Sequence, residues 1–260
     1  MTDILRLSLI QSHLHWGDVK ANLQHFTETL SVLKNKTDLI VLPEMFSSGF
    51  MMSGKDEIAS HTDTAIDWML EQAELLNSHI MGSLIVKENE SFYNRMYTVS
   101  PQGDVSTYDK RHLFRMGNEH EHFDAGKLKG IVKIGEWRIR PIVCYDLRFP
   151  VWIRNQQDYD LLVCVANWPD ARRDVWNTLL KSRAIDNQAY VAGVNRVGTD
   201  GMDLNYAGDS SLFDARGRVL AKCEDYKDDI QTVSLSWKDL QSFRTKFPVY
   251  LDADDFEIKL

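Results

Sequence analysis

Seven short apolar stretches along the chain have the length and composition of buried β-strands. Some alternate between apolar and polar residues, and others are apolar throughout, as strands covered on both faces tend to be. The predicted strands span residues 5–11, 38–44, 79–86, 92–99, 137–144, 160–167 and 189–195. Residues 208–222 predict a hairpin, because the sequence Asp-Ala-Arg-Gly supplies turn chemistry between two apolar runs.

Helical periodicity fills several of the intervals between these strands. One predicted helix follows the expected N-cap Asp18, with apolar residues at spacings of three and four: Val19, Leu23, Phe26, Leu30 and Leu33. Residues 62–78 and 173–187 have the same periodicity. Since no linker, repeat or shift in composition divides the chain, residues 1–260 are predicted to form a single α/β domain with a mixed sheet and helices covering the sheet faces.

Composition and charge narrow the class of protein. Hydrophobic residues make up 43% of the 260 residues and charged residues 26%, which are ordinary values for a folded domain. The formal net charge of -8 argues against binding to a nucleic-acid backbone. No apolar run approaches the ~20 residues that span a bilayer, and the N-terminus lacks a signal-peptide pattern. We therefore expect no membrane association and a cytoplasmic location.

The three cysteines, Cys144, Cys164 and Cys223, have neither the number nor the spacing of a disulfide framework or a metal site. They are expected to be free thiols in a reducing compartment. Cys164 and Cys223 fit inert buried positions. Cys144 differs because polar residues follow it at once, so that it marks the point where the chain leaves the apolar layer.

Three residues with reactive side chains stand at the ends of apolar or alternating stretches. Glu44 closes residues 38–44, Lys110 follows an alternating stretch, and Cys144 closes residues 137–144. Ligands of layered α/β folds usually bind beyond strand ends, so these side chains could converge. Taken singly, each also fits an ordinary structural role: a buried thiol, a solvated carboxylate and a solvated lysine in a run of charges. The apolar residues after Glu44 would desolvate its carboxylate, which suits a general base.

Three segments, taken together and in order, resemble the signature segments of the nitrilase superfamily of carbon-nitrogen hydrolases. They are L-P-E-M-F at 42–46, Y-D-K-R-H-L-F at 108–114 and V-C-Y-D-L-R-F-P at 143–150. Residues 166–169, 182–191 and 208–221 are also similar to segments of that family. The resemblance extends over nearly the whole chain, and three ordered motifs are far more specific than any one of them.

This resemblance implies an α-β-β-α sandwich with mixed sheets and a catalytic triad of Glu44, Lys110 and Cys144. It also implies a homodimer or a larger homo-oligomer. The residues M-G-N-E-H after the lysine segment, together with C-Y-D-L-R-F-P, resemble the omega-amidase branch. Members of that branch remove the side-chain amide of 2-oxo-dicarboxylic acid monoamides such as 2-oxoglutaramate or 2-oxosuccinamate. The same chemistry could instead act on another linear amide, a carbamoyl-amine or a nitrile.

The chemistry of the side chains agrees with the roles that the resemblance implies. Glu44 can accept the thiol proton of Cys144, and the charge of Lys110 favours the thiolate. Lys110 and the backbone N–H of Tyr145 are the expected donors to the oxyanion. Family members often have a second glutamate after the lysine, and alignment of Gly126 with the family's glycine favours Glu119 over Glu121. This mechanism requires neither a metal nor an organic cofactor.

Rival interpretations use other side chains in the same segments. A papain-like enzyme would pair Cys144 with His112, His120 or His122. A metal site could use His120 and His122 with the glutamates beside them. A non-catalytic binding protein would have lost the triad, whereas all three residue types are present. A thiol redox protein would need a resolving cysteine, and none lies near Cys144 in sequence.

An anionic substrate requires local cations in a chain of negative net charge, preferably arginines that can hold a carboxylate through paired hydrogen bonds. Candidates in segments expected to border the site are Arg148, Arg172, Arg173 and Arg196. For Arg148 a structural ion pair competes with substrate contact. Candidates for the apolar part of the pocket are Met45, Phe50 and Trp168, which could equally be packing residues.

Overall fold

A computed structural model describes residues 3–259 and contains two mixed sheets of six strands each. In the first sheet the strand order is β14-β1-β2-β3-β4-β5. The strands of this sheet, in chain order, are β1 Ile4–Gln11, β2 Leu39–Val41, β3 His79–Glu88, β4 Ser91–Val99, β5 Val105–Asp109 and β14 Asp229–Ser236. β1, β2 and β3 are parallel to one another, and the outer strands are antiparallel to their neighbours.

The second sheet has the order β13-β12-β9-β8-β7-β6 and repeats this arrangement, with a parallel centre formed by β7, β8 and β9. Its strands are β6 Val132–Ile134, β7 Trp137–Val143, β8 Leu161–Ala166, β9 Tyr190–Asn195, β12 Ser211–Phe213 and β13 Val219–Lys222. A separate two-stranded ribbon joins β10 Val197–Thr199 to β11 Asn205–Ala207.

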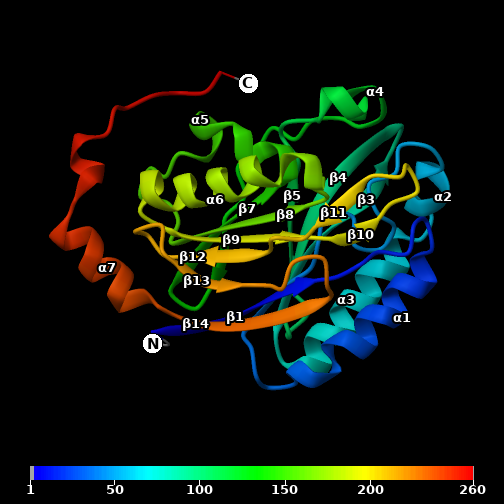
Figure 1. The fold of residues 1–260 in the computed structure, drawn as a ribbon, viewed down its shortest axis with the longest axis horizontal. Helices are drawn as coiled ribbons and strands as arrows, with labels where there is room; N and C mark the ends of the chain where they lie inside the picture. The colour runs from blue at the N-terminus through cyan, green and yellow to red at the C-terminus, as the bar shows by residue number, and fades with distance from the viewer. Residues whose placement is uncertain (1–2, 260) are drawn as a thin grey trace.

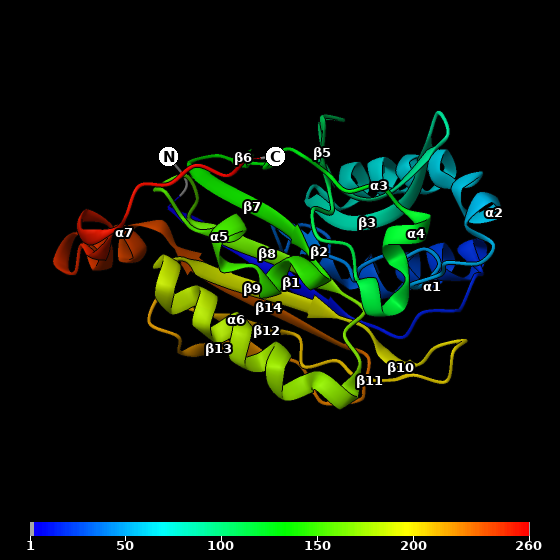
Figure 2. The ribbon, with the colours of Figure 1, turned by 90° about the horizontal axis from the view of Figure 1, so that it is seen from above.

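Helices cover the outer faces of both sheets, so that the two sheets form the inner layers (Figures 1 and 2). α1 Val19–Leu30 and α3 Thr62–Leu76 lie over the first sheet, and α5 Pro150–Ile153 and α6 Arg173–Asn187 lie over the second. The remaining helices are α2 Lys55–Ala59, α4 Glu119–His122 and α7 Trp237–Lys246, with 3₁₀ turns at Ser31–Leu33, Arg115–Gly117, Cys144–Arg148, Asp170–Arg172 and Val249–Asp252. This arrangement confirms the predicted α-β-β-α sandwich.

Alternation along β2 divides the buried residues between two cores. Leu39 and Val41 pack in the core that the first sheet shares with the second, whereas Ile40 between them packs with α1 and α3. Successive side chains of a strand point to opposite faces, so a three-residue strand that is covered on both sides must be apolar throughout. β8 is likewise buried along its whole length, and it is apolar throughout for the same reason.

Most of the predicted elements are confirmed. The predicted N-cap is present, because the Asp18 side chain accepts a hydrogen bond from the backbone N–H of Ala21 at 2.9 Å, and β12 pairs with β13 as the predicted hairpin. Residues 38–44 form a shorter strand than predicted. Pro43 has no N–H to donate, and Met45 has a φ of 46°, so the chain turns out of the sheet there.

β14, the β10–β11 ribbon and α7 were not among the predicted elements. β14 is a half-exposed edge strand, and only Leu235 in it is fully buried, so its sequence carries a weak apolar signal. In the described part of the chain, no helix is long and apolar enough to cross a membrane.

Candidate active site

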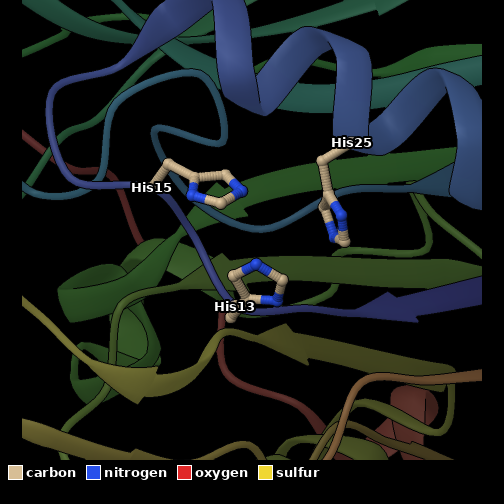
Figure 3. A group of neighbouring side chains, drawn as sticks. All are labelled: His13, His15 and His25. Atoms are coloured by element: carbon tan, nitrogen blue, oxygen red, sulfur yellow. The ribbon is translucent and has the colours of Figure 1, made fainter.

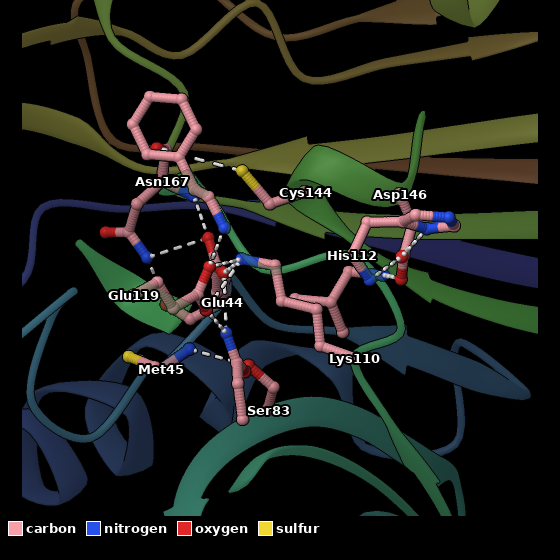
Figure 4. Close-up of polar contacts among 12 residues, drawn as sticks. Glu44, Met45, Ser83, Lys110, His112, Glu119, Cys144, Asp146 and Asn167 are labelled. Carbon is pink, nitrogen blue, oxygen red and sulfur yellow. Dashed lines mark hydrogen bonds and ion pairs between the residues drawn. The ribbon is translucent and has the colours of Figure 1, made fainter. Parts of the chain in front are cut away.

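Turns at the ends of strands in both sheets bring the three predicted triad residues together (Figure 4). Glu44 lies in the turn after β2, Lys110 directly follows β5, and Cys144 directly follows β7. Gly126 holds its own segment close to the end of β5, since its N–H donates to the carbonyl of Lys110 at 2.9 Å. A Cβ atom at Gly126 would lie 2.1 Å from the carbonyl oxygen of Asp109, so only glycine fits there.

The ammonium of Lys110 lies between two buried carboxylates. Its Nζ is 2.9 Å from Oε1 of Glu44 and 2.9 Å from the carboxylate of Glu119, and all three side chains are fully buried. Burial alone would lower the pKa of Lys110, but the charges of Glu119 and Glu44 outweigh it and raise the pKa above its ordinary value. Lys110 therefore carries a fixed positive charge inside the site.

Neutral donors hold both carboxylates in place around this lysine. Asn94 Nδ2 donates to Glu44 Oε1 at 2.7 Å, and the backbone N–H of Asn167 donates to Glu44 Oε2 at 2.7 Å. The backbone N–H of Phe114 donates to Glu119 Oε2 at 2.6 Å. Burial raises the pKa of Glu119, and the neighbouring Lys110 charge opposes that rise. The geometry favours Glu119 over Glu121 as the supporting glutamate, because the side chain of Glu121 is largely exposed.

Cys144 has an unusual backbone conformation. Its φ is 45°, in the left-handed region that residues with a side chain seldom adopt, and a 3₁₀ turn begins at this residue. Such a conformation costs about 1–3 kcal/mol and is kept where surrounding contacts enforce it. Burial and the Glu44 carboxylate raise the pKa of the Cys144 thiol well above its ordinary value, while Lys110 acts in the opposite direction. A carboxylate and an ammonium of opposite charge therefore both act on this thiol.

Asp146 holds this strained turn against the lysine segment. Its buried carboxylate accepts hydrogen bonds from the Tyr108 hydroxyl at 2.7 Å, from the backbone N–H of His112 at 2.8 Å and from Val143 N–H at 3.1 Å. His112 Nδ1 lies 2.7 Å from the same carboxylate. The first nitrogen donors of a short helix have no partner within it, and Tyr145 is the second residue of this turn.

A cavity of about 360 Å³ opens at Cys144 and Lys110. Its wall is mostly apolar and aromatic, and the residues in contact with it include Trp16, Phe50, Met52, Phe114, Tyr145, Trp168, Met202, Leu204 and Tyr206. Arg148 and Arg172 also line it. Their guanidinium groups stack on Trp168 and Phe114 at 5.1 and 5.3 Å, and neither has a carboxylate partner among residues 3–259. Aromatic stacking holds these cations without neutralising them.

Several residues predicted for the pocket lie elsewhere. Arg173, next to Arg172, is not in the cavity wall, because its guanidinium is ion-paired with Asp209 and Asp225. Arg196 is fully buried, stacks on Tyr206 and donates to backbone carbonyls. Met45 is also fully buried and packs in the core under α1 and α3. These three are therefore structural residues, whereas Phe50, Trp168, Arg148 and Arg172 do line the cavity.

The histidine and metal alternatives find little support in the geometry. Among the described residues, the only hydrogen-bond partner of the Cys144 thiol is the carbonyl of Asn167, at 4.0 Å. His112 is bonded to Asp146 and stacked on Phe149, and the His122 ring, although it lines the cavity, lies 3.2 Å from Lys55 Nζ. A metal ion at His120 and His122 could not use Glu119 as a ligand, because that carboxylate is bonded to Lys110.

Asn94 and Asn167 position Glu44, and neither residue was identified from the sequence. Asn94 shares one face of β4 with Phe92 and Met96, two residues away on either side, so the strand pattern does place an amide among buried side chains. A buried amide needs hydrogen-bond partners, which is a signal for a polar site. Asn167 directly follows β8, at the same sheet end as Cys144.

Comparisons with known proteins identify the family of this chain. A family model described as carbon-nitrogen hydrolase matches residues 6–245. The chain is 47% identical over 252 residues to omega-amidase YafV of Yersinia enterocolitica, covering 97% of this chain and 98% of that protein. It is 32% identical over 251 residues to 2-oxoglutaramate amidase of Bacillus subtilis, covering 95% and 96% of the two chains.

A solved structure with a similar fold is that of XC1258 from Xanthomonas campestris, described as a CN-hydrolase superfamily protein with an arsenic adduct in the active site. It matches with a TM-score of 0.96 and 40% identity, covering 98% of this chain and 99% of that one. The family expected from the three sequence segments is thereby confirmed. The chain belongs to the carbon-nitrogen hydrolase family of the nitrilase superfamily and is an enzyme of that family.

Proposed function

We propose that this enzyme is an omega-amidase that hydrolyses the side-chain amide of small 2-oxo-dicarboxylic acid monoamides, of the 2-oxoglutaramate type, to the acid and ammonia. The observation that carries most weight is the pair of arginines, Arg148 and Arg172, in the wall of the cavity that contains Cys144. Neither guanidinium is neutralised by a carboxylate of the described chain, so both are available to an anionic substrate. The similarity to an omega-amidase and a 2-oxoglutaramate amidase along nearly the whole chain supports the same substrate class.

In the proposed acylation step, Glu44 takes the thiol proton of Cys144 as Sγ attacks the amide carbon. The carbonyl oxygen becomes an oxyanion, and the Lys110 ammonium and the Tyr145 N–H donate to it. When the tetrahedral adduct collapses, the carbon–nitrogen bond breaks and Glu44 gives its proton to the nitrogen, which leaves as ammonia. The product is a thioester on Cys144.

Hydrolysis of the thioester uses the same groups again. Glu44, now a carboxylate, takes a proton from a water molecule as the water oxygen attacks the thioester carbon. Lys110 and the Tyr145 N–H stabilise the second oxyanion. The bond to Sγ breaks, the thiol recovers a proton from Glu44, and the acid leaves. Asn94 and Asn167 keep the Glu44 carboxylate oriented in both steps, because they occupy its two oxygens from fixed positions.

Substrate selection tests the proposal. We expect 2-oxoglutaramate to be hydrolysed with a kcat/KM about 10²-fold or more above that of pentanamide, which has the same chain length but no carboxylate, because charge-assisted hydrogen bonds contribute about 1.5–3 kcal/mol each. Arg148→Gln or Arg172→Gln should raise KM for 2-oxoglutaramate about tenfold or more and leave pentanamide hydrolysis nearly unchanged. The rate of ammonia release measures the hydrolysis of both substrates.

Arg216→Gln is the matched control, since Arg216 is exposed and packs on Phe243, away from the cavity. It removes one positive charge and should not change KM. An equal loss of activity toward both substrates in the Arg148 and Arg172 variants would contradict a carboxylate-binding role. So would a parent enzyme that does not prefer 2-oxoglutaramate to pentanamide. A nitrile or carbamoyl-amine hydrolysed faster would instead identify a different substrate class.

The two neighbouring glutamates provide a test of the support for Lys110. We expect Glu119→Gln to lower kcat by about 10²-fold, because a displacement of the lysine near 1 Å is enough to misplace the oxyanion donor. Glu121→Gln makes the same chemical change on an exposed side chain two residues away and should retain full activity. If the two variants behaved alike, the buried contact between Glu119 and Lys110 would have no role in catalysis.

We also propose that residues 1–260 form one carbon-nitrogen hydrolase domain, that the enzyme assembles as a homodimer or a larger homo-oligomer, and that it acts in the cytoplasm. The family resemblance supports the assembly, and three free cysteines fit a reducing compartment. Light scattering coupled to size-exclusion chromatography measures the oligomer. A monomer at micromolar concentration would contradict the expected assembly.

A further inference from the structure

Three histidines form a cluster outside the proposed active site. His13 and His15 lie in the segment after β1, and His25 lies on α1 (Figure 3). Figure 3 shows the three rings facing a common space, and one nitrogen from each ring lies within 4.8 Å of the others. The ring centroids of His13 and His25 are 4.4 Å apart, and those of His13 and His15 are 4.9 Å apart.

The spacing of these nitrogens is close to that of a metal site. Imidazole nitrogens bind Zn²⁺ at about 2.0–2.1 Å, so two ligands of a tetrahedral ion lie about 3.3 Å apart. Rotation of the His15 side chain, the most exposed of the three, would bring its ring nearer to the other two. His15 is exposed, and its backbone, not its ring, forms the hydrogen bonds to Asn22 on α1, which leaves the ring free to turn.

Two of the histidines already have the partners that metal ligands usually have. A histidine that binds a metal through one nitrogen commonly forms a hydrogen bond through the other. Nδ1 of His13 lies 2.7 Å from a carboxylate oxygen of Asp228, and Nε2 of His25 lies 2.7 Å from the hydroxyl of Ser12. The other nitrogen of each ring, Nε2 of His13 and Nδ1 of His25, is not used in these contacts and can bind an ion.

The charge around the cluster also favours a cation. The same Asp228 oxygen lies 3.9 Å from Nε2 of His25 and adds a negative charge at the edge of the cluster. Three imidazole ligands suit zinc and related transition metals better than magnesium or calcium.

We propose that His13, His15 and His25 bind one divalent transition-metal ion of the zinc type, with Asp228 orienting His13. The ion would take no part in amide hydrolysis and would instead link the segment after β1 to α1. Trp16, which directly follows His15, lines the active-site cavity, and a Cβ atom on Gly201 would lie 2.3 Å from its indole nitrogen. Metal binding therefore braces one wall of the cavity.

Titration of the full chain, free of any affinity tag, with Co²⁺ tests the site directly. Tetrahedral Co²⁺ has a visible absorption that an octahedral aqueous ion lacks, so the spectrum reports both binding and geometry. We expect one ion per chain, displacement by Zn²⁺, and a melting temperature that rises with Zn²⁺ concentration. His25→Gln and the milder His15→Gln, at an exposed position, should each weaken Co²⁺ binding at least about tenfold.

Two controls separate this cluster from other metal-binding groups. His61→Gln removes an exposed histidine outside the cluster and should leave Co²⁺ affinity unchanged. Cys144→Ala removes the active-site thiol and should also leave it unchanged. Absence of a tetrahedral spectrum, or binding that survives His15→Gln and His25→Gln but is lost in Cys144→Ala, would overturn the inference. None of these results depends on which amide the enzyme hydrolyses.

Discussion

Replacement of Cys144 by alanine is expected to lower ammonia release from 2-oxoglutaramate by at least about 10⁴-fold, because the alanine side chain cannot form the thioester intermediate. The fold should survive. Alanine retains the Cβ atom, so the strained φ of 45° is neither relieved nor worsened, and the contacts of Asp146 with the turn do not involve the thiol.

The matched control is Cys223→Ala, which removes a buried thiol remote from the triad and should retain activity. Rapid acid quenching of the parent enzyme with substrate, followed by peptide mass analysis, should find the acyl group on the peptide that contains Cys144 and not in Cys144→Ala. Substantial turnover by Cys144→Ala, or an acyl group on another residue, would exclude the thioester mechanism.

Replacement of Lys110 by methionine should reduce both activity and stability. Loss of an oxyanion donor lowers kcat by about 10²–10³-fold. The variant also leaves Glu44 and Glu119 buried without their shared cation, and removal of one partner from a buried ion pair typically costs about 3–5 kcal/mol in the free energy of unfolding. Urea unfolding and ammonia release measure the two effects separately.

A second variant distinguishes the two roles of this lysine. In Lys110→Met/Glu119→Gln one of the two unpaired charges is removed, so much of the lost stability should return while activity stays low. If the double variant were no more stable than Lys110→Met, carboxylate repulsion would not be the cause of the destabilisation. If activity returned with stability, Lys110 would serve only to hold the fold together.

The sequence predicts best where local pattern determines structure. The helix after Asp18 and the hairpin at 208–222 depend on side-chain periodicity and turn residues that lie close together in the chain. The convergence of Glu44 with Asn167 could not be obtained in this way, since the hydrogen bond between them joins residues 123 positions apart. Periodicity indicates that a polar residue is buried, but it does not identify the partner.

The arginines show the same limit on a smaller scale. Arg172 and Arg173 are adjacent and chemically identical, yet one lines the cavity and the other binds Asp209. Successive residues entering a helix project about 100° apart, so a shift of one position decides whether an arginine lines the cavity or pairs with a carboxylate. For Arg148, the sequence allowed an ion pair, and the structure gives it an aromatic partner within the described residues instead.

The pairing of β1 with β14 has a consequence for the order in which the chain can fold. β14 is hydrogen-bonded to β1 over eight residue pairs, from Ile4 with Ser236 to Gln11 with Asp229. During synthesis, one edge of the first strand therefore has no partner until residue 236 has left the ribosome. Contacts so distant in sequence form slowly, and an unpaired edge is prone to join another chain. Completion of the first sheet is consequently a late event, and until then this edge of β1 is open to pairing with another chain.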